Sequence, residues 1–193
     1  MAAILVEKLM PSRLTFVTSS ENKLAEVERL LGQRVIRASL PLDEIQDIAL
    51  EPVVIHKVRH AYARVQQPVL VEDTGLAFAA WNGLPGALVK WFLSTVGTDG
   101  LCRLLHGEEN RTATASTLFA YYDGTLLRLY PGTVTGSIPH IPRGSSGFGW
   151  DAIFQPLESE RTFAEMSLAE KDRFSMRRLA LEQFRASGLL DSC

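Results

Sequence analysis

Two adjacent acidic residues, Glu72 and Asp73, follow an apolar run at residues 69–71 that is typical of a strand buried on both faces. Paired carboxylates at the end of such a strand are unfavourable unless they are solvated or bind a cation. Mg²⁺ favours sites with one or two carboxylates, which phosphate oxygens and waters complete. A turn capped by an Asx side chain is the structural alternative. The pair therefore indicates either a metal-dependent catalytic site or an ordinary turn.

A second candidate site lies at residues 18–23, Thr-Ser-Ser-Glu-Asn-Lys, between a short apolar run and a helical pattern. The free N–H groups and positive dipole end of a helix N-terminus suit an anion. Lys23 stands one turn into the helix, where it could reach a phosphate. A serine in front of a helix is more often only an N-cap. The segment alone therefore leaves phosphate binding and simple capping both open.

A third candidate is the glycine-rich segment at residues 143–151, which carries Phe148, Trp150 and Asp151. Glycines permit backbone conformations that other residues cannot hold. An aromatic side chain on such a loop can stack on a nucleobase, which contributes about 1–3 kcal/mol and discriminates poorly between bases. An aromatic cap over the core is the alternative. If the loop does bind a base, selectivity has to come from hydrogen bonds to the base edge.

The elements around these sites alternate between strand and helix patterns, which predicts an α/β protein with a mixed sheet and packed helices. An Asp-Gly pair between two β-prone runs predicts a hairpin. Gly32 is a normal helix stop, and Gly97 separates two short helices. The predicted strands are residues 14–17, 35–36, 69–71, 112–122, 125–135 and 152–154, and the predicted helices are 24–31, 52–66, 87–96, 99–105 and 175–187.

Composition narrows the classes of function. A chain of 193 residues fits one domain. Its net charge of −2 provides no basic field for a nucleic-acid partner. Cys102 and Cys193 form no metal-ligand pattern, so a reducing compartment is expected. The apolar run at residues 2–6 is shorter than a signal peptide needs, and no run approaches a membrane span. We therefore expect a cytoplasmic protein that binds neither nucleic acid nor membrane.

Several motifs in a fixed order make the chain resemble the inosine triphosphate pyrophosphatase (HAM1-like) family. They are Val-Glu-Asp-Thr-Gly at 71–75, Gly-Leu-Pro-Gly at 83–86, Gly-Phe-Gly-Trp-Asp at 147–151, Thr-Phe-Ala-Glu-Met at 162–166, Lys171 and Ser-Met-Arg at 175–177. The resemblance spans about residues 14–184. It implies an elongated mixed sheet flanked by helices, in two lobes with the active-site cleft between them. Residues 1–12 would be a poorly ordered extension and 13–193 a single two-lobed domain, assembled as a homodimer.

The resemblance also implies roles for individual residues. Asp73 and Glu72 would be catalytic, and Glu44 and Asp73 would bind Mg²⁺, with Mn²⁺ tolerated. Substrate would contact Thr18, Ser19, Ser20, Lys23, Lys57, Thr74, Lys90, Phe148, Gly149, Trp150, Asp151, Lys171, Met176 and Arg177.

Two of these positions depart from the family pattern. Ser20 stands where the pattern has Asn, so the triphosphate clamp loses an amide donor. Met176 stands where the pattern has His, and a thioether cannot donate a hydrogen bond. Lys171 and Arg177 remain as donors for the 6-keto side of a purine, and the neighbouring Arg178 could take over part of the role. A lost donor is expected to relax selectivity and to leave hydrolysis intact.

Three functions follow from these observations. The first is Mg²⁺-dependent hydrolysis of non-standard purine nucleoside triphosphates (ITP, dITP, XTP) to the monophosphate and pyrophosphate, which would cleanse the nucleotide pool. The second keeps this chemistry with a relaxed or shifted nucleotide preference. The third is a nucleotide-binding protein with weakened catalysis, which Ser20 and Met176 would favour. Retention of Glu44, Asp73 and Lys90 favours an enzyme.

Overall fold

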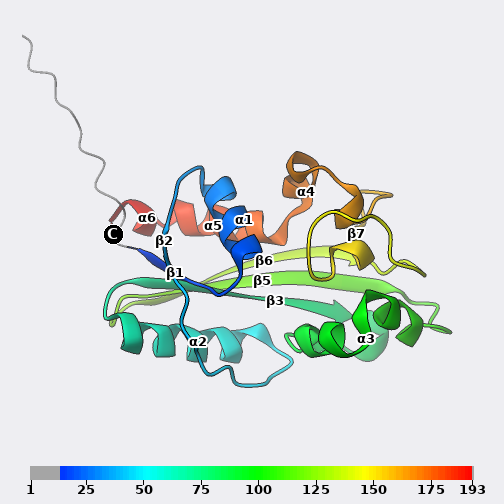
Figure 1. Cartoon of the computed structure of the whole chain (residues 1–193), viewed down its shortest axis with the longest axis horizontal. Helices are drawn as coiled ribbons and strands as arrows, with labels where there is room; N and C mark the ends of the chain where they lie inside the picture. Colours follow the sequence, from blue (N-terminus) through cyan, green and yellow to red (C-terminus); the bar gives the residue numbers. More distant parts are fainter. Residues whose placement is uncertain (1–13, 193) are drawn as a thin grey trace, which may run out of the picture.

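The computed structural model describes residues 14–192, whose centre is a mixed sheet of seven strands (Figure 1). The strand order is β2-β1-β3-β5-β6-β7, with β4 paired to β3. β1 is parallel to β2 and β3, and the other pairs are antiparallel. The predicted α/β class with a mixed sheet is confirmed. The strands are β1 (Thr15–Val17), β2 (Ile36–Ala38), β3 (Val69–Phe78), β4 (Pro85–Gly86), β5 (Thr112–Tyr122), β6 (Leu127–Ser137) and β7 (Gln155–Pro156).

Helices pack against both faces of this sheet (Figure 1). α2 packs on β3 and β5 from one face, and α1 and α5 form a cluster with the opposite side of the same strands. α3 lies at the far end of β3, against β4 and the turn η2. The helices are α1 (Glu21–Leu31), α2 (Leu50–Val65), α3 (Val89–Leu104), α4 (Leu168–Phe174), α5 (Met176–Ala186) and α6 (Leu189–Ser192), with 3₁₀ turns η1 (Ala79–Trp81), η2 (Asp151–Ile153) and η3 (Phe163–Glu165).

The alternation of side chains along β3 separates its two acidic residues. Leu70 packs with α1 and α5, whereas Val69 and Val71 pack with α2. Because successive residues of a strand point to opposite faces, Glu72 shares the face of Leu70, and Asp73 shares the face of Val71. One strand thus delivers one carboxylate to each side of the sheet.

The same strand is left partly unpaired along one edge. β1 pairs only with Val69 and Leu70, and β4 pairs with Leu76 and Ala77. Within residues 14–192, no strand covers the stretch of β3 between these two pairings. The backbone and side chains of residues 71–75 therefore border a gap in the sheet, and this gap positions the candidate site.

A close approach between α5 and β6 brings the start of α5 down to the sheet. A Cβ on Gly132 would overlap the backbone carbonyl of Met176. Only glycine leaves room for this contact. Arg177 directly follows Met176, so this close approach brings the Arg177 side chain within hydrogen-bonding distance of Glu72 on β3.

Most predicted elements agree with the structure. α1 ends at Gly32 in a left-handed C-cap, and β5 and β6 form the predicted hairpin. α3 is interrupted at Gly97 (φ 68°, ψ −176°), as the sequence predicted. The strand predicted at residues 152–154 is wrong, because residues 151–153 form the 3₁₀ turn η2. Ile153 and Phe154 are fully buried among aromatic side chains, so the apolar run reflects burial and not strand pairing.

Two sequence predictions concern properties beyond the fold. No helix within residues 14–192 has the length and apolar character needed to cross a bilayer. Cys102 is buried, and burial raises the pKa of its thiol to about 11, which keeps it an unreactive core residue. The extension predicted at residues 1–12 lies outside the described residues.

Candidate active site

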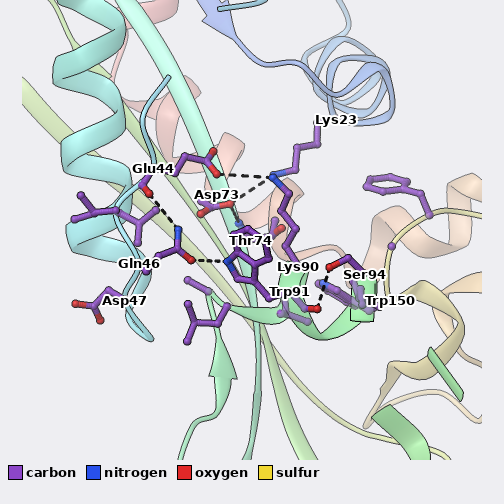
Figure 2. A pocket seen from close by; sticks show the side chains of 18 residues that line it. Lys23, Glu44, Gln46, Asp47, Asp73, Thr74, Lys90, Trp91, Ser94 and Trp150 are labelled. Carbon is purple, nitrogen blue, oxygen red and sulfur yellow. Dashed lines mark hydrogen bonds and ion pairs between the residues drawn. The ribbon is translucent and has the colours of Figure 1, made fainter. Parts of the chain in front are cut away.

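Two adjoining cavities open along the gap in the sheet. The cavity beside α1 has a volume of about 630 Å³, and the cavity beside α3 has a volume of about 450 Å³. We call them the α1 cavity and the α3 cavity. Figure 2 shows the α3 cavity from close by. Both are lined by Lys23, Glu44, Asp73 and Lys90.

The α1 cavity is bordered by the loop that starts α1. Ser20 is the N-cap of this helix, and its hydroxyl accepts a hydrogen bond from the backbone N–H of Lys23 at 3.2 Å. The N–H of Ser20 donates to the hydroxyl of Thr18 at 3.1 Å. Arg37 of β2 donates to the carbonyls of Thr18 and Ser19. The hydroxyl at position 20 is thus occupied with capping, and Asn22 points away as an exposed residue that lines neither cavity.

Open carboxylates and lysines face each other across the two cavities. Lys57 of α2 contacts Glu44 at 2.7 Å, and Lys90 of α3 lies 4.0 Å from the other oxygen of the same carboxylate. Lys23 lies 3.8 Å from Asp73. Burial opposes ionisation of Glu44, but Lys57, Lys90 and Lys23 together outweigh this effect and lower the pKa of Glu44. Burial likewise opposes the charge of Lys57, and Asp73 and Glu44 together raise the pKa of Lys57.

Glu72 also lines the α1 cavity, but its carboxylate is buried and has a different environment from that of Asp73. Its buried carboxylate forms two 2.7 Å hydrogen bonds with the guanidinium of Arg177 and a 3.1 Å ion pair with Lys23. Burial disfavours its charge, but the attraction of Arg177, and next of Lys23, lowers its pKa to about 2. A carboxylate held this way does not accept a proton near neutral pH. In this geometry Glu72 is an anchor for Arg177, and its catalytic role stays a prediction.

Glu26 of α1 links two further cations of this buried cluster. Its two oxygens contact Lys171 at 2.8 Å and Arg177. Lys171 also contacts Asp151 at 2.7 Å. Burial raises the pKa of Asp151, an effect that Lys171 only partly offsets. We name Glu26, Glu72, Asp151, Lys171 and Arg177 the buried ion cluster; its side chains are at most 9% exposed.

The glycine loop is tied to this cluster. The backbone N–H of Phe148 donates to the Asp151 carboxylate at 2.9 Å. A Cβ on Gly147 would overlap that carboxylate, so the loop requires a glycine there. The ring of Phe148 lies 4.9 Å from the Lys171 ammonium and 5.9 Å from the Arg177 guanidinium carbon. Phe148 therefore covers the two buried cations while it lines the α3 cavity.

The remaining residues predicted from the sequence divide between cavity and core. Thr74 and Gly149 line the α3 cavity. Trp150 also lines it, although most of its ring packs in the core beside Phe154 and Phe163. Met176 is 3% exposed in the same apolar cluster and lines neither cavity. The side chain at position 176 is therefore a core contact in this structure.

The donor set suits a metal of the magnesium type. Within residues 14–192, no group of three or more His, Cys, Asp or Glu side chains could by itself hold a metal ion. Glu44 and Asp73 provide two carboxylates, and each already faces an ammonium group. Mg²⁺ needs only one or two carboxylates when phosphate oxygens and waters complete its shell. A structural zinc site with four protein ligands does not fit these residues.

Four residues of this region were not identified from the sequence: Glu26, Arg37, Gln46 and Trp91. Glu26 lies on α1 next to Val27, and a charge beside an apolar stripe was the signal that could have identified it. Gln46 and Trp91 have no such signal, because an exposed Gln in a loop and an aromatic near a helix start are common. Their importance follows only from their contact, which is described below.

Comparisons with known proteins show which proteins this chain is similar to. A sequence model described as the Ham1 family matches residues 14–187. An inosine triphosphate pyrophosphatase of Schizosaccharomyces pombe is 42% identical over 176 residues, which cover 89% of this chain and 93% of that protein. A dITP/XTP pyrophosphatase of Thermococcus kodakarensis is 41% identical over 175 residues, covering 89% and 95%. The solved structure of a HAM1 protein from Coxiella burnetii matches with a TM-score of 0.80 and 29% identity, over 90% of this chain and 96% of that one.

Proposed function

The chain belongs to the Ham1 family, and on this premise we propose that it hydrolyses non-standard purine nucleoside triphosphates to the monophosphate and pyrophosphate. Its relatives include an inosine triphosphate pyrophosphatase and a dITP/XTP pyrophosphatase. The corresponding substrates for this chain are ITP, dITP and XTP. Removal of these nucleotides would cleanse the pool from which nucleic acids are made.

One observation supports this proposal most strongly. The open carboxylates of Glu44 and Asp73 share two joined cavities with the ammonium groups of Lys23 and Lys90, and Lys57 borders one of them. A nucleoside triphosphate bound with a divalent cation brings both a polyanion and a cation. A site with both acids and lysines in reach can bind both. An aromatic residue on a glycine loop adjoins the same space, where a base could stack.

The residues present fit a Mg²⁺ ion held by Glu44 and Asp73, with Mn²⁺ as a substitute. When bound, the ion would neutralise phosphate charge as a Lewis acid. The ammonium group of Lys57 now lies 2.7 Å from Glu44, so a cation is already accommodated beside this carboxylate. With the ion bound, Lys23, Lys57 and Lys90 are available to the phosphate oxygens.

Asp73 is our candidate for the group that orients the attacking water and accepts its proton. Its side chain is 20% exposed, and of the two carboxylates on β3 it is the one directed away from Arg177. Water attack at the α-phosphorus would release pyrophosphate. The N-terminus of α1, with Thr18, Ser19 and Ser20, would support the phosphates through backbone N–H groups and the helix dipole.

Base recognition is assigned to the glycine loop and to the two buried cations beneath it. Phe148 would stack on the purine. Arg177 has five N–H groups and uses three for Glu72 and Glu26, so it retains donors for the 6-keto oxygen of hypoxanthine or xanthine. Lys171 has three N–H groups and uses two. The carboxylates of the buried ion cluster would orient these donors before the base arrives.

The burial of Met176 favours a second candidate function, the same hydrolysis with relaxed selectivity. The side chain at position 176 packs in the core and offers no donor, so discrimination depends on Lys171 and Arg177. A site with fewer donors rejects an amino group in place of the keto oxygen less strongly. ATP, whose base carries a 6-amino group, would then be hydrolysed at a larger fraction of the ITP rate.

The gap in the sheet also fits the predicted cleft between two lobes, with β1 and α1 on one side and β4 and α3 on the other. The single two-lobed domain at residues 13–193 is part of this proposal. The homodimer and the cytoplasmic location expected from the sequence stay predictions.

A hydrolysis panel with Mg²⁺ tests the function. It compares ITP, XTP, dITP, GTP, ATP, dUTP and dTTP and identifies the product as pyrophosphate or phosphate. We expect pyrophosphate, released fastest from ITP and XTP. The variant Asp73→Asn is measured beside the wild type. Its circular dichroism spectrum should show that the fold is kept, and its hydrolysis rate should fall by about 10²- to 10⁴-fold, the usual contribution of a general base.

Other outcomes would select another function. Pyrophosphate at similar rates from all nucleotides would support relaxed selectivity. Binding without turnover would support a nucleotide-binding protein. A substantial residual rate in Asp73→Asn would remove Asp73 from the mechanism.

A further inference from the structure

The loop that carries Glu44 has little structure of its own. Residues 39–49 join β2 to α2 without helix or strand. Leu40 and Leu42 pack against the core beside α2, but residues 43–49, which include Glu44, are exposed. The Glu44 side chain itself is 37% exposed. An exposed, irregular loop does not hold a carboxylate in one place through packing. Some other contact has to position Glu44 at the cavities.

The side chain of Gln46 makes such a contact (Figure 2). Its amide nitrogen donates a hydrogen bond to the backbone carbonyl of Glu44 at 3.1 Å. Its amide oxygen accepts a hydrogen bond from the indole N–H of Trp91. Trp91 stands in the first turn of α3, next to Lys90. One side chain therefore connects the backbone of Glu44 to a regular helix.

Few side chains could make both of these bonds. The indole N–H of Trp91 can only donate, and a backbone carbonyl can only accept. The bridge between them therefore needs one acceptor and one donor, which an amide side chain has. A methionine at position 46 would fill a similar volume and make neither bond. We call the contact of Gln46 with Trp91 and the Glu44 carbonyl the Gln46 bridge.

Two further contacts join the loop to the same region of the fold. The N–H of Ala87 donates to the carbonyl of Ile48 at 2.9 Å, and Lys90 lies 4.0 Å from the Glu44 carboxylate. Ala87, Lys90 and Trp91 all belong to the segment that enters α3. The bridge is thus one of a set of contacts that hold the loop against this helix.

We propose that Gln46 and Trp91 are positioning residues, which hold the Glu44 loop against α3 and thereby raise the affinity of the site for a divalent cation. The inference rests on the proposed function for the identity of the ion. Trp91 is 56% exposed, an unusual position for an indole, and the bridge explains its orientation. Base selectivity belongs to other residues, so the bridge should affect metal dependence and leave the ITP-to-GTP ratio unchanged.

The first test measures the loop itself, without nucleotide or metal. Hydrogen–deuterium exchange of residues 39–49 is compared in the wild type, Trp91→Phe and Gln46→Met. Faster exchange of this segment in both variants is expected. The control is Trp81→Phe, which removes an indole that packs on Phe78 and on Phe92 of α3 but takes no part in the bridge; it should exchange like the wild type. Unchanged exchange in both bridge variants would overturn the proposal, whatever the hydrolysis panel shows.

The second test measures the metal. Mn²⁺ binding is followed by electron paramagnetic resonance with a non-hydrolysable ITP analogue, and the Mg²⁺ dependence of the rate is measured at saturating ITP. Each bridge variant should need about 2- to 10-fold more metal, the factor that corresponds to one net hydrogen bond. The double variant should resemble Gln46→Met, because Trp91→Phe removes a hydrogen bond that Gln46→Met already removes.

The opposing result is specific. If Trp91→Phe raised the KM for ITP at saturating metal while Gln46→Met behaved like the wild type, Trp91 would contact the nucleotide and would not position the loop. If both variants showed the metal dependence and the turnover of the wild type, the proposed hydrolysis would stand, and the proposed role of the Gln46 bridge in metal binding would be overturned.

Discussion

The charged residues of this site form two regions that differ in exposure and in partners. The buried ion cluster under the glycine loop has side chains at most 9% exposed, and each acid there contacts an arginine or a lysine. The open region, in contrast, comprises Glu44, Asp73, Lys23, Lys57 and Lys90, whose side chains are 13–80% exposed. Two lysines of the open region also contact the buried one: Lys23 forms ion pairs with Glu72 and Asp73, and the Lys57 ammonium donates a hydrogen bond to the backbone carbonyl of Glu72 at 3.3 Å.

The difference corresponds to two kinds of task. Donors that read a base edge have to be oriented before binding, and buried, paired charges provide that orientation. Groups that exchange a metal ion and phosphates have to release one partner and accept another, and exposed pairs do this with little change in free energy. The two regions should therefore respond differently to mutation: the buried one through stability, and the open one through activity.

The largest expected effect is on stability, from Arg177→Met. This change leaves Glu72 and Glu26 buried without their main partner, which should lower the free energy of unfolding by about 3–5 kcal/mol. The matched variant in the open region is Lys90→Met, where the loss should stay within about 0.5 kcal/mol. Urea unfolding at pH 7 measures both. Equal losses of unfolding free energy in the two variants would show that the buried and the open region contribute equally to stability.

A smaller effect is expected from acid. The folded-state pKa of Glu72, about 2, is below its ordinary value of 4.5, so its stabilising contribution is complete above pH 4.5 and is lost as the pH falls towards 2. Glu72→Gln should be less stable than the wild type at pH 7, though less affected than Arg177→Met because an amide still accepts a hydrogen bond. The difference in unfolding free energy between the wild type and Glu72→Gln should become smaller between pH 4.5 and 2, which unfolding of both proteins at a series of pH values measures. A difference that stays constant over this range would show that Glu72 does not titrate there.

The smallest expected effect concerns selectivity, in Met176→His. A donor to the 6-keto oxygen at this position should raise the preference for ITP over ATP by about 2- to 10-fold, as one hydrogen bond would. Because Met176 packs in an apolar cluster, the variant should also lose stability. Competing hydrolysis rates and thermal unfolding measure the two effects. An unchanged ratio together with reduced stability would show that position 176 serves the core alone.

The order of the motifs along the chain was enough to predict the family. Local patterns were enough to predict the α/β class, the hairpin at β5 and β6 and the break at Gly97. These features depend on local patterns, such as glycine stops and alternation, that tertiary contacts here reinforce. The strand predicted at residues 152–154 failed because a buried apolar run looks the same in a strand and in a 3₁₀ turn.

Within the site, the sequence by itself determined which chemical groups are available: two adjacent acids after a buried strand, lysines at helix starts, and aromatics on a glycine loop. The tertiary structure decided which of these groups are buried in ion pairs and which face the cavities. The pleat of β3 sends Glu72 to Arg177 and Asp73 to the cavities, because neighbouring residues on a strand face opposite sides. The partners Glu26 and Arg177, 151 residues apart, meet only because α1 and α5 pack on the same face of the sheet. Burial and pairing, which set the pKa and the accessibility of each acid, arise from such long-range contacts and have no local signature in the chain.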